Sequence, residues 1–63
     1  MKHEIKHYEV EVEGIKNGKR ETLTIGDVPA YTKREAIYMA ENKAESLGYL
    51  NPVYKEAVRK KVD

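Results

Sequence analysis

The dipeptide Asn17-Gly18 lies between two segments in which apolar and polar residues alternate, and this combination is typical of a β-hairpin. A two-residue turn of type I′ needs a positive φ at both central residues, and Asn followed by Gly adopts it most readily. The turn fixes the strand register, which pairs Lys16 with Lys19, Val12 with Leu23, Val10 with Ile25, Glu11 with Thr24 and Glu13 with Thr22. A slip by one residue would separate the two apolar faces, so the turn and the alternation predict the same hairpin.

We expect the first strand over residues 5–13 and the second over residues 20–25. In the first, Tyr8, Val10 and Val12 face the core, whereas His7, Glu9, Glu11 and Glu13 face outward. Residues 26–30, with Gly26 and Pro29, are expected to form a loop.

A helix is predicted over residues 33–47. Thr32 and Glu35 have the spacing of a capping box, in which each side chain accepts a hydrogen bond from the backbone N–H of the other residue. Gly48 suits the left-handed position that commonly ends a helix. At helical periodicity one apolar stripe forms, made of Ala36, Ile37, Ala40, Ala44 and Leu47. The small alanine side chains would let this helix pack closely on a sheet.

The last segment has two interpretations. Asn51-Pro52 could begin a second helix, which would give a ββαα chain. We favour a third strand, because a lone hairpin under one helix is too thin a sheet to be stable by itself. We expect this strand to lie parallel to the first, with Tyr54, Val58 and Val62 inward and Lys55, Arg59 and Lys61 outward, beside the carboxylates of the first strand. The predicted fold is α+β, a ββαβ domain with strand order 2-1-3.

Length and charge bound the function. A chain of 63 residues predicts a single domain over residues 1–63, with little room for the deep pocket of an enzyme. The 12 Lys and Arg nearly balance the 11 Asp and Glu, so overall charge favours no partner. No cysteine is present, which suits the cytoplasm, and no apolar run suggests secretion or a membrane partner.

We predict no catalytic, cofactor or metal residues. His3 and His7 would stand about 13 Å apart on a strand, too far to share one ion. Ser46 falls in a helical turn without the geometry that activates a nucleophile. Glu9, Glu11 and Glu13 form a carboxylate row that we interpret as a solvated face.

A protein partner is the first expectation. Tyrosine is enriched in protein interfaces, and four residues near the helix are the candidate contacts: Tyr31, Tyr38, Met39 and Tyr49. The uncovered sheet face is a second candidate surface, with Ile5, Ile15, Val53 and Ala57 expected outward. That face, or an edge strand, could also join two copies in a homodimer.

Nucleic acid is the alternative partner. A parallel third strand would bring its basic end toward the hairpin tip, and the combined cluster could contact phosphates. The candidate contacts are Lys16, Lys19, Arg20, Arg59, Lys60 and Lys61.

The run Gly26-Asp27-Val28-Pro29-Ala30-Tyr31-Thr32, followed by Glu35-Ala36 and by alanines at 40 and 44, resembles the loop and helix of HicB-type antitoxin domains. The resemblance covers about half the chain, and Ala30 stands where those domains usually have glycine, so we carry over no function. In size and style the chain also resembles short accessory proteins of bacterial viruses that bind one host factor. We therefore predict a small non-enzymatic binding module, a regulator or inhibitor that contacts a protein. The alternatives are a nucleic-acid-binding accessory protein and a self-associating structural module.

Overall fold

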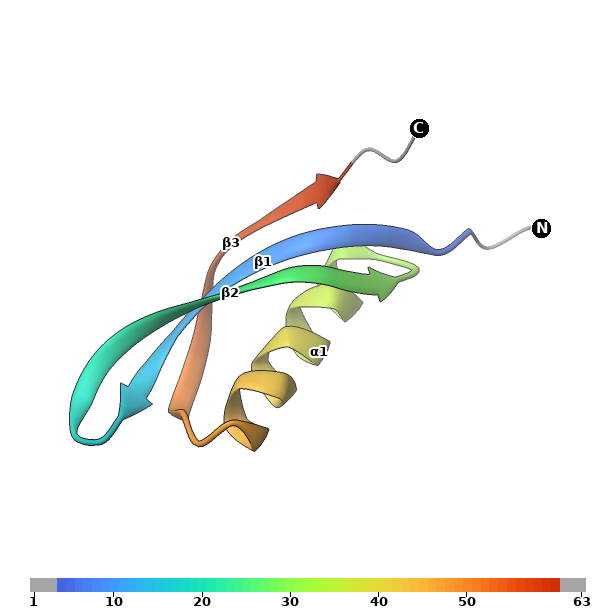
Figure 1. Ribbon diagram of the computed structural model, residues 1–63. Helices are drawn as coiled ribbons and strands as arrows, with labels where there is room; N and C mark the ends of the chain where they lie inside the picture. The colour runs from blue at the N-terminus through green and yellow to red at the C-terminus, as the bar shows by residue number, and fades with distance from the viewer. Residues whose placement is uncertain (1–3, 61–63) are drawn as a thin grey trace.

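A computed structural model of the chain describes residues 4–60 and contains three strands and one helix (Figure 1). The elements follow in the order β1 (Lys6–Lys16), β2 (Lys19–Ala30), α1 (Lys33–Ser46) and β3 (Leu50–Lys60). The strands form one sheet of order β2-β1-β3, and α1 packs on one face of it. The predicted α+β class, ββαβ order and strand order are confirmed. The ββαα alternative is wrong, because the last segment forms β3.

The hairpin has the register that its turn predicts. Asn17 and Gly18 have φ values of 55° and 76°, and Lys16 pairs directly with Lys19. Val12 lies opposite Leu23 and Val10 opposite Ile25, while Glu11 and Glu13 lie opposite Thr24 and Thr22. Both strands extend up to the turn, so β1 is longer than the segment that the alternation indicates.

The predicted loop at residues 26–30 is wrong. β2 continues to Ala30, which pairs with Lys6. Between Tyr8 and Val10 the pairing shifts by one residue, so that β2 carries an extra residue opposite β1. This bulge accommodates Gly26 within the strand. Pro29 is tolerated because β2 is an edge strand, where a missing N–H need not break the ladder.

Helix α1 begins as its capping residues predict. The Thr32 hydroxyl accepts a hydrogen bond from the Glu35 N–H at 3.1 Å. The Glu35 carboxylate accepts from the N–H of Tyr31 at 2.7 Å, one residue earlier than a capping box would have it. At the other end Gly48 has a φ of 99°. Ala36, Ala40 and Ala44 are fully buried against the sheet, as the apolar stripe predicts, and Ile37 is partly buried. Leu47, expected in the same stripe, is exposed where the helix ends.

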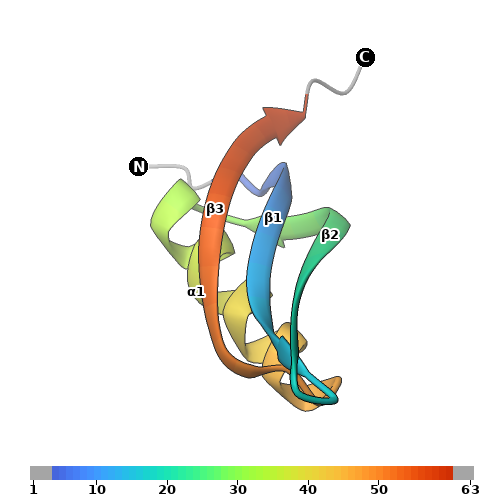
Figure 2. The same cartoon turned by 90° about the vertical axis from the view of Figure 1, so that its left-hand side faces the viewer.

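Strand β3 is antiparallel to β1, so the expected parallel pairing is wrong (Figure 2). Helix α1 connects β2 to β3 and returns the chain to the hairpin-tip end before β3 starts. A helical crossover makes the two strands that it joins parallel, here β2 and β3. Since β1 lies between them and is antiparallel to β2, it must also be antiparallel to β3.

Two irregularities in β3 decide which side chains face the helix. The pairing of β3 with β1 shifts between Glu11 and Val12 and again between Glu13 and Ile15, with the extra residues on β3. Ala57 lies opposite Val10 and is buried, whereas Val58 lies opposite Glu9 and is exposed. The inward placement of Val58 and the outward placement of Ala57 are therefore both wrong.

The outer edge of β3 is partly obstructed. Pro52 has no N–H, and the Tyr54 N–H donates to a carboxylate oxygen of Glu41 on α1 at 3.1 Å. Both residues lie in the first half of β3, and the bond from Tyr54 connects that part of the strand to the helix. At these two positions β3 has no free backbone N–H to donate to a further strand.

The core lies between α1 and the inner face of β1. Val10 and Val12 are its largest fully buried side chains, and Tyr8 lies beside them on the same face. The other buried core residues are Val28 and Ala30 of β2, Ala57 of β3, Tyr49 and the three helix alanines. The outer face of the sheet has no helix over it (Figure 2).

Candidate functional site

The four candidate contact residues around the helix lie at different points along it. Tyr38 is 66% exposed on α1, while Met39 lies on the flank of the helix beside β2, where it lines a hollow with Ile25 and Val28. Tyr31 precedes the helix and Tyr49 follows it, so the helix of 14 residues, about 21 Å long, separates them. The four residues do not share one surface.

Tyr49 belongs to the core, with 8% of its surface exposed. Its side chain packs over Gly14, where an added Cβ would lie 3.0 Å from the Tyr49 Cβ. The amine of Lys16 lies 5.0 Å from the centre of the tyrosine ring, a cation–π contact. Tyr49 thus stabilises the fold, and one cation of the hairpin tip covers it.

The two basic clusters lie at opposite ends of the sheet. Lys16, Lys19 and Arg20 are at the hairpin tip, whereas Lys60 pairs with His7 near the start of β1 (Figure 1). Arg59 is opposite Tyr8, and Lys61 is outside the described residues. The antiparallel direction of β3 removes the joint phosphate-binding cluster that a parallel strand would have formed.

The outer face of the sheet is not covered by the helix, and we call it the open face. Directly paired residues of antiparallel strands point to the same side, so the register assigns this face. From β1 it carries His7, Glu9, Glu11, Glu13 and Ile15; from β2, Arg20, Thr22 and Thr24; from β3, Leu50, Val53, Glu56, Val58 and Lys60.

Apolar side chains on the open face lie mainly along β3. Val53 is 60% exposed, and Ile15, Leu50 and Val58 are exposed as well. Ile15 and Val53 are on this face as the sequence predicts, whereas Leu50 and Val58 were not expected there. A strict alternation along β3 cannot reveal them, because the bulged residues change which side the following residues face.

Carboxylates occupy the middle of the same face. Glu9, Glu11 and Glu13 alternate along β1, and Glu56 of β3 lies directly opposite Glu11. The expected pairing of this acidic row with Lys55, Arg59 and Lys61 is wrong, because Val58, Glu56 and Val53 are the actual neighbours. A hollow of about 180 Å³ is lined by Glu9, Glu11, Thr24, Glu56 and Val58.

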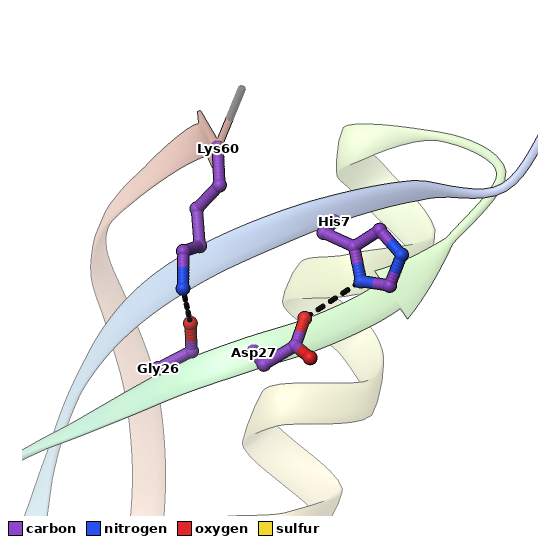
Figure 3. Close-up of polar contacts among 4 residues, drawn as sticks. All are labelled: His7, Gly26, Asp27 and Lys60. Carbon is purple, nitrogen blue, oxygen red and sulfur yellow. Dashed lines mark hydrogen bonds and ion pairs between the residues drawn. The ribbon is translucent and has the colours of Figure 1, made fainter. Parts of the chain in front are cut away.

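At the end of the sheet away from the hairpin tip, two polar contacts connect the strands (Figure 3). The His7 Nδ1 lies 2.7 Å from a carboxylate oxygen of Asp27. The Lys60 amine donates to the Gly26 carbonyl at 2.9 Å, reaching from β3 across β1 to the bulge in β2. Both contacts are exposed, and in each of them two polar groups of this chain pair with each other.

Two kinds of feature are absent from the described part of the chain. Among residues 4–60, no three His, Asp or Glu side chains are arranged to hold a metal ion. The same residues include no helix long and apolar enough to cross a membrane. What they present is a shallow surface that combines apolar and acidic side chains.

Comparison with family models, with characterised proteins and with solved structures finds no match to this chain. The resemblance to HicB-type domains therefore depends only on the residues quoted for it.

Proposed function

We propose that this chain is a small non-enzymatic binding module that regulates or inhibits a protein partner in the cytoplasm by contacting it through the open face. One observation carries the proposal: Ile15, Leu50, Val53 and Val58 stand exposed on the same side of a sheet that no helix covers. Apolar side chains that gather on one surface are typical of a site for another macromolecule.

The open face suits a partner better than the helix does. On α1, exposed Tyr38 has Glu41, Asn42 and Glu45 on the same polar side of the helix. On the sheet, several apolar side chains lie on neighbouring strands that main-chain hydrogen bonds hold in place. A rigid surface loses little conformational entropy when it binds.

Affinity capture from the source cells tests this proposal with a matched pair of variants. The double variant Val53→Thr/Val58→Thr keeps β-branched side chains, and so the strand, but makes the open face polar. Tyr38→Ala removes the one aromatic side chain of α1, which is exposed. We expect wild type and Tyr38→Ala to retain the same dominant protein, and the double variant to lose it.

Retention by the double variant, or loss in Tyr38→Ala alone, would place the contact elsewhere and contradict the proposal. Sedimentation of the purified chain at increasing concentration tests the self-associating alternative. A dimer that Val53→Thr/Val58→Thr dissociates would identify the partner as a second copy of this chain and overturn the proposal.

A further inference from the structure

The charge on the open face indicates the chemistry of what binds there. Four carboxylates, those of Glu9, Glu11, Glu13 and Glu56, lie on this face, and Glu11 and Glu56 are direct cross-strand neighbours. Like charges directly opposite each other in a sheet are unfavourable. The fold therefore keeps a pair that costs stability at the centre of its uncovered surface.

No Lys or Arg among the described residues is paired with these carboxylates. Lys60 is on the same face, but its amine is directed to the Gly26 carbonyl (Figure 3). Arg20 is opposite Ile15 near the hairpin tip and lines a second hollow with Glu13, away from Glu9, Glu11 and Glu56. Arg59 pairs with Tyr8 on the other side of the sheet.

Apolar groups border the acidic centre. Val58 lines the hollow of about 180 Å³ together with Glu9, Glu11 and Glu56. Val53 lies opposite Glu13 and lines the neighbouring hollow toward the hairpin tip. A ligand that fills these hollows would meet carboxylate oxygens and valine methyl groups side by side.

We infer that the open face binds a segment of a partner protein in which Arg or Lys residues stand next to apolar residues. The inference rests on the proposed function and adds the partner's chemistry. A cationic side chain in the first hollow would relieve the repulsion between Glu11 and Glu56, and its apolar neighbours would cover Val53 and Val58.

The same charges disfavour the other occupants. Two open faces placed against each other would bring carboxylates against carboxylates, so a second copy of the chain is repelled. Phosphate groups of a nucleic acid would meet the same four carboxylates. A basic, apolar-bordered protein segment is the occupant whose charge complements the face.

Nuclear magnetic resonance titration of the isotope-labelled full chain tests this inference with three synthetic peptides of equal length. One contains Arg and Leu, the second Arg and Ser, and the third Glu and Leu. We expect the Arg-Leu peptide to shift the amide resonances of the open-face residues of β1 and β3. The Arg-Ser peptide should bind more weakly, the Glu-Leu peptide should not bind, and added salt should weaken binding.

Two double variants that remove the same number of charges locate the binding site. Glu9→Gln/Glu56→Gln removes two carboxylates from the first hollow, and Glu21→Gln/Glu45→Gln removes two that are not on the open face. We expect the first double variant to bind the Arg-Leu peptide about fivefold to tenfold more weakly than wild type, and the second double variant less than about twofold more weakly. Thermal unfolding should show that Glu9→Gln/Glu56→Gln is at least as stable as wild type.

The inference would be overturned if both double variants bound the Arg-Leu peptide equally well, or if the peptide shifted only the amide resonances of α1. Its failure is distinguishable from that of the proposed function. If capture still depends on Val53 and Val58 but not on Glu9 and Glu56, the face binds a partner of different chemistry. If capture depends on neither pair, the proposed function fails as well.

Discussion

The amine of Lys60 lies 2.9 Å from the carbonyl oxygen of Gly26, so a side chain of β3 reaches across β1 to the bulge in β2. This bond ties the two edge strands together at the end of the sheet away from the turn. An exposed hydrogen bond contributes modestly, since water competes for both groups.

We expect Lys60→Met to lower the free energy of unfolding by less than about 1 kcal/mol in urea denaturation. The carbonyl ¹³C resonance of Gly26 should shift, because its hydrogen-bond donor is gone. Lys55→Met is the control, a matched change on the same strand that should leave that resonance in place. A Gly26 resonance unmoved by Lys60→Met would show that the bond is not formed in solution.

Gly14 is required by the close approach of Tyr49. A Cβ at Gly14 would lie 3.0 Å from the Tyr49 Cβ and 3.2 Å from the Leu50 carbonyl oxygen. Gly14→Ala should therefore lower the free energy of unfolding by about 1–3 kcal/mol. Gly26→Ala is the comparison, since no atom beyond the adjacent residues lies within 4 Å of the added Cβ, and its effect should be smaller. Equal effects in thermal unfolding would refute this account of Gly14.

Val10 and Val53 are the same type of residue in different environments, so substituting each one measures the effect of burial. Val10 is fully buried beneath α1, whereas Val53 is exposed on the open face. Val10→Ala removes two buried carbon groups and leaves a cavity, so we expect it to cost about 2 kcal/mol. Val53→Ala should cost less than about 0.5 kcal/mol. Denaturant titrations of both variants measure the difference, and a large loss in Val53→Ala would mean that the open face is covered in solution.

The cap of α1 depends on the hydroxyl of Thr32, which accepts from the Glu35 N–H. Thr32→Ala should lower the free energy of unfolding by about 1 kcal/mol. Thr32→Ser keeps the hydroxyl and should retain most of the stability. Circular dichroism during thermal unfolding measures both variants. If serine failed to restore what alanine removes, the methyl group of Thr32 rather than its hydroxyl would be responsible.

Local signals in the sequence predicted the hairpin and the helix start. The positive φ values of Asn17 and Gly18 and the hydrogen bond between Thr32 and Glu35 involve residues close in sequence. Such features depend little on the rest of the fold. The register of β1 and β2 followed because the turn fixes it and the apolar alternation agrees.

The faces of β3 could not be predicted in the same way. The pairing shift between Glu11 and Val12 places Tyr54 and Ala57 on one side, although alternation would separate them. A bulge of this kind is set by the partner strand and the helix, which a single segment does not reveal. The open face was consequently predicted in part, with Ile15 and Val53 but without Leu50, Val58 and Glu56.

The direction of β3 could have been predicted from the sequence. Only three residues, 47–49, separate α1 from β3, so the chain reverses directly after the helix. Comparing β3 with β2, the strand at the other end of the crossover, would have given the observed antiparallel pairing with β1. The burial of Tyr49, by contrast, needs the space above Gly14, which exists only once β1 and β3 are neighbours.

The obstruction at Pro52 and Tyr54 limits how copies of this chain could assemble through their strand edges. Continuous growth of a sheet from molecule to molecule requires two competent edges on each one. Here β3 lacks available N–H donors at Pro52 and Tyr54, in the first half of the strand, which leaves β2 as the less obstructed edge. Pairing through β2 alone would join two molecules and then stop, so the obstruction at these two positions acts against continuous growth of a sheet and leaves the open face accessible.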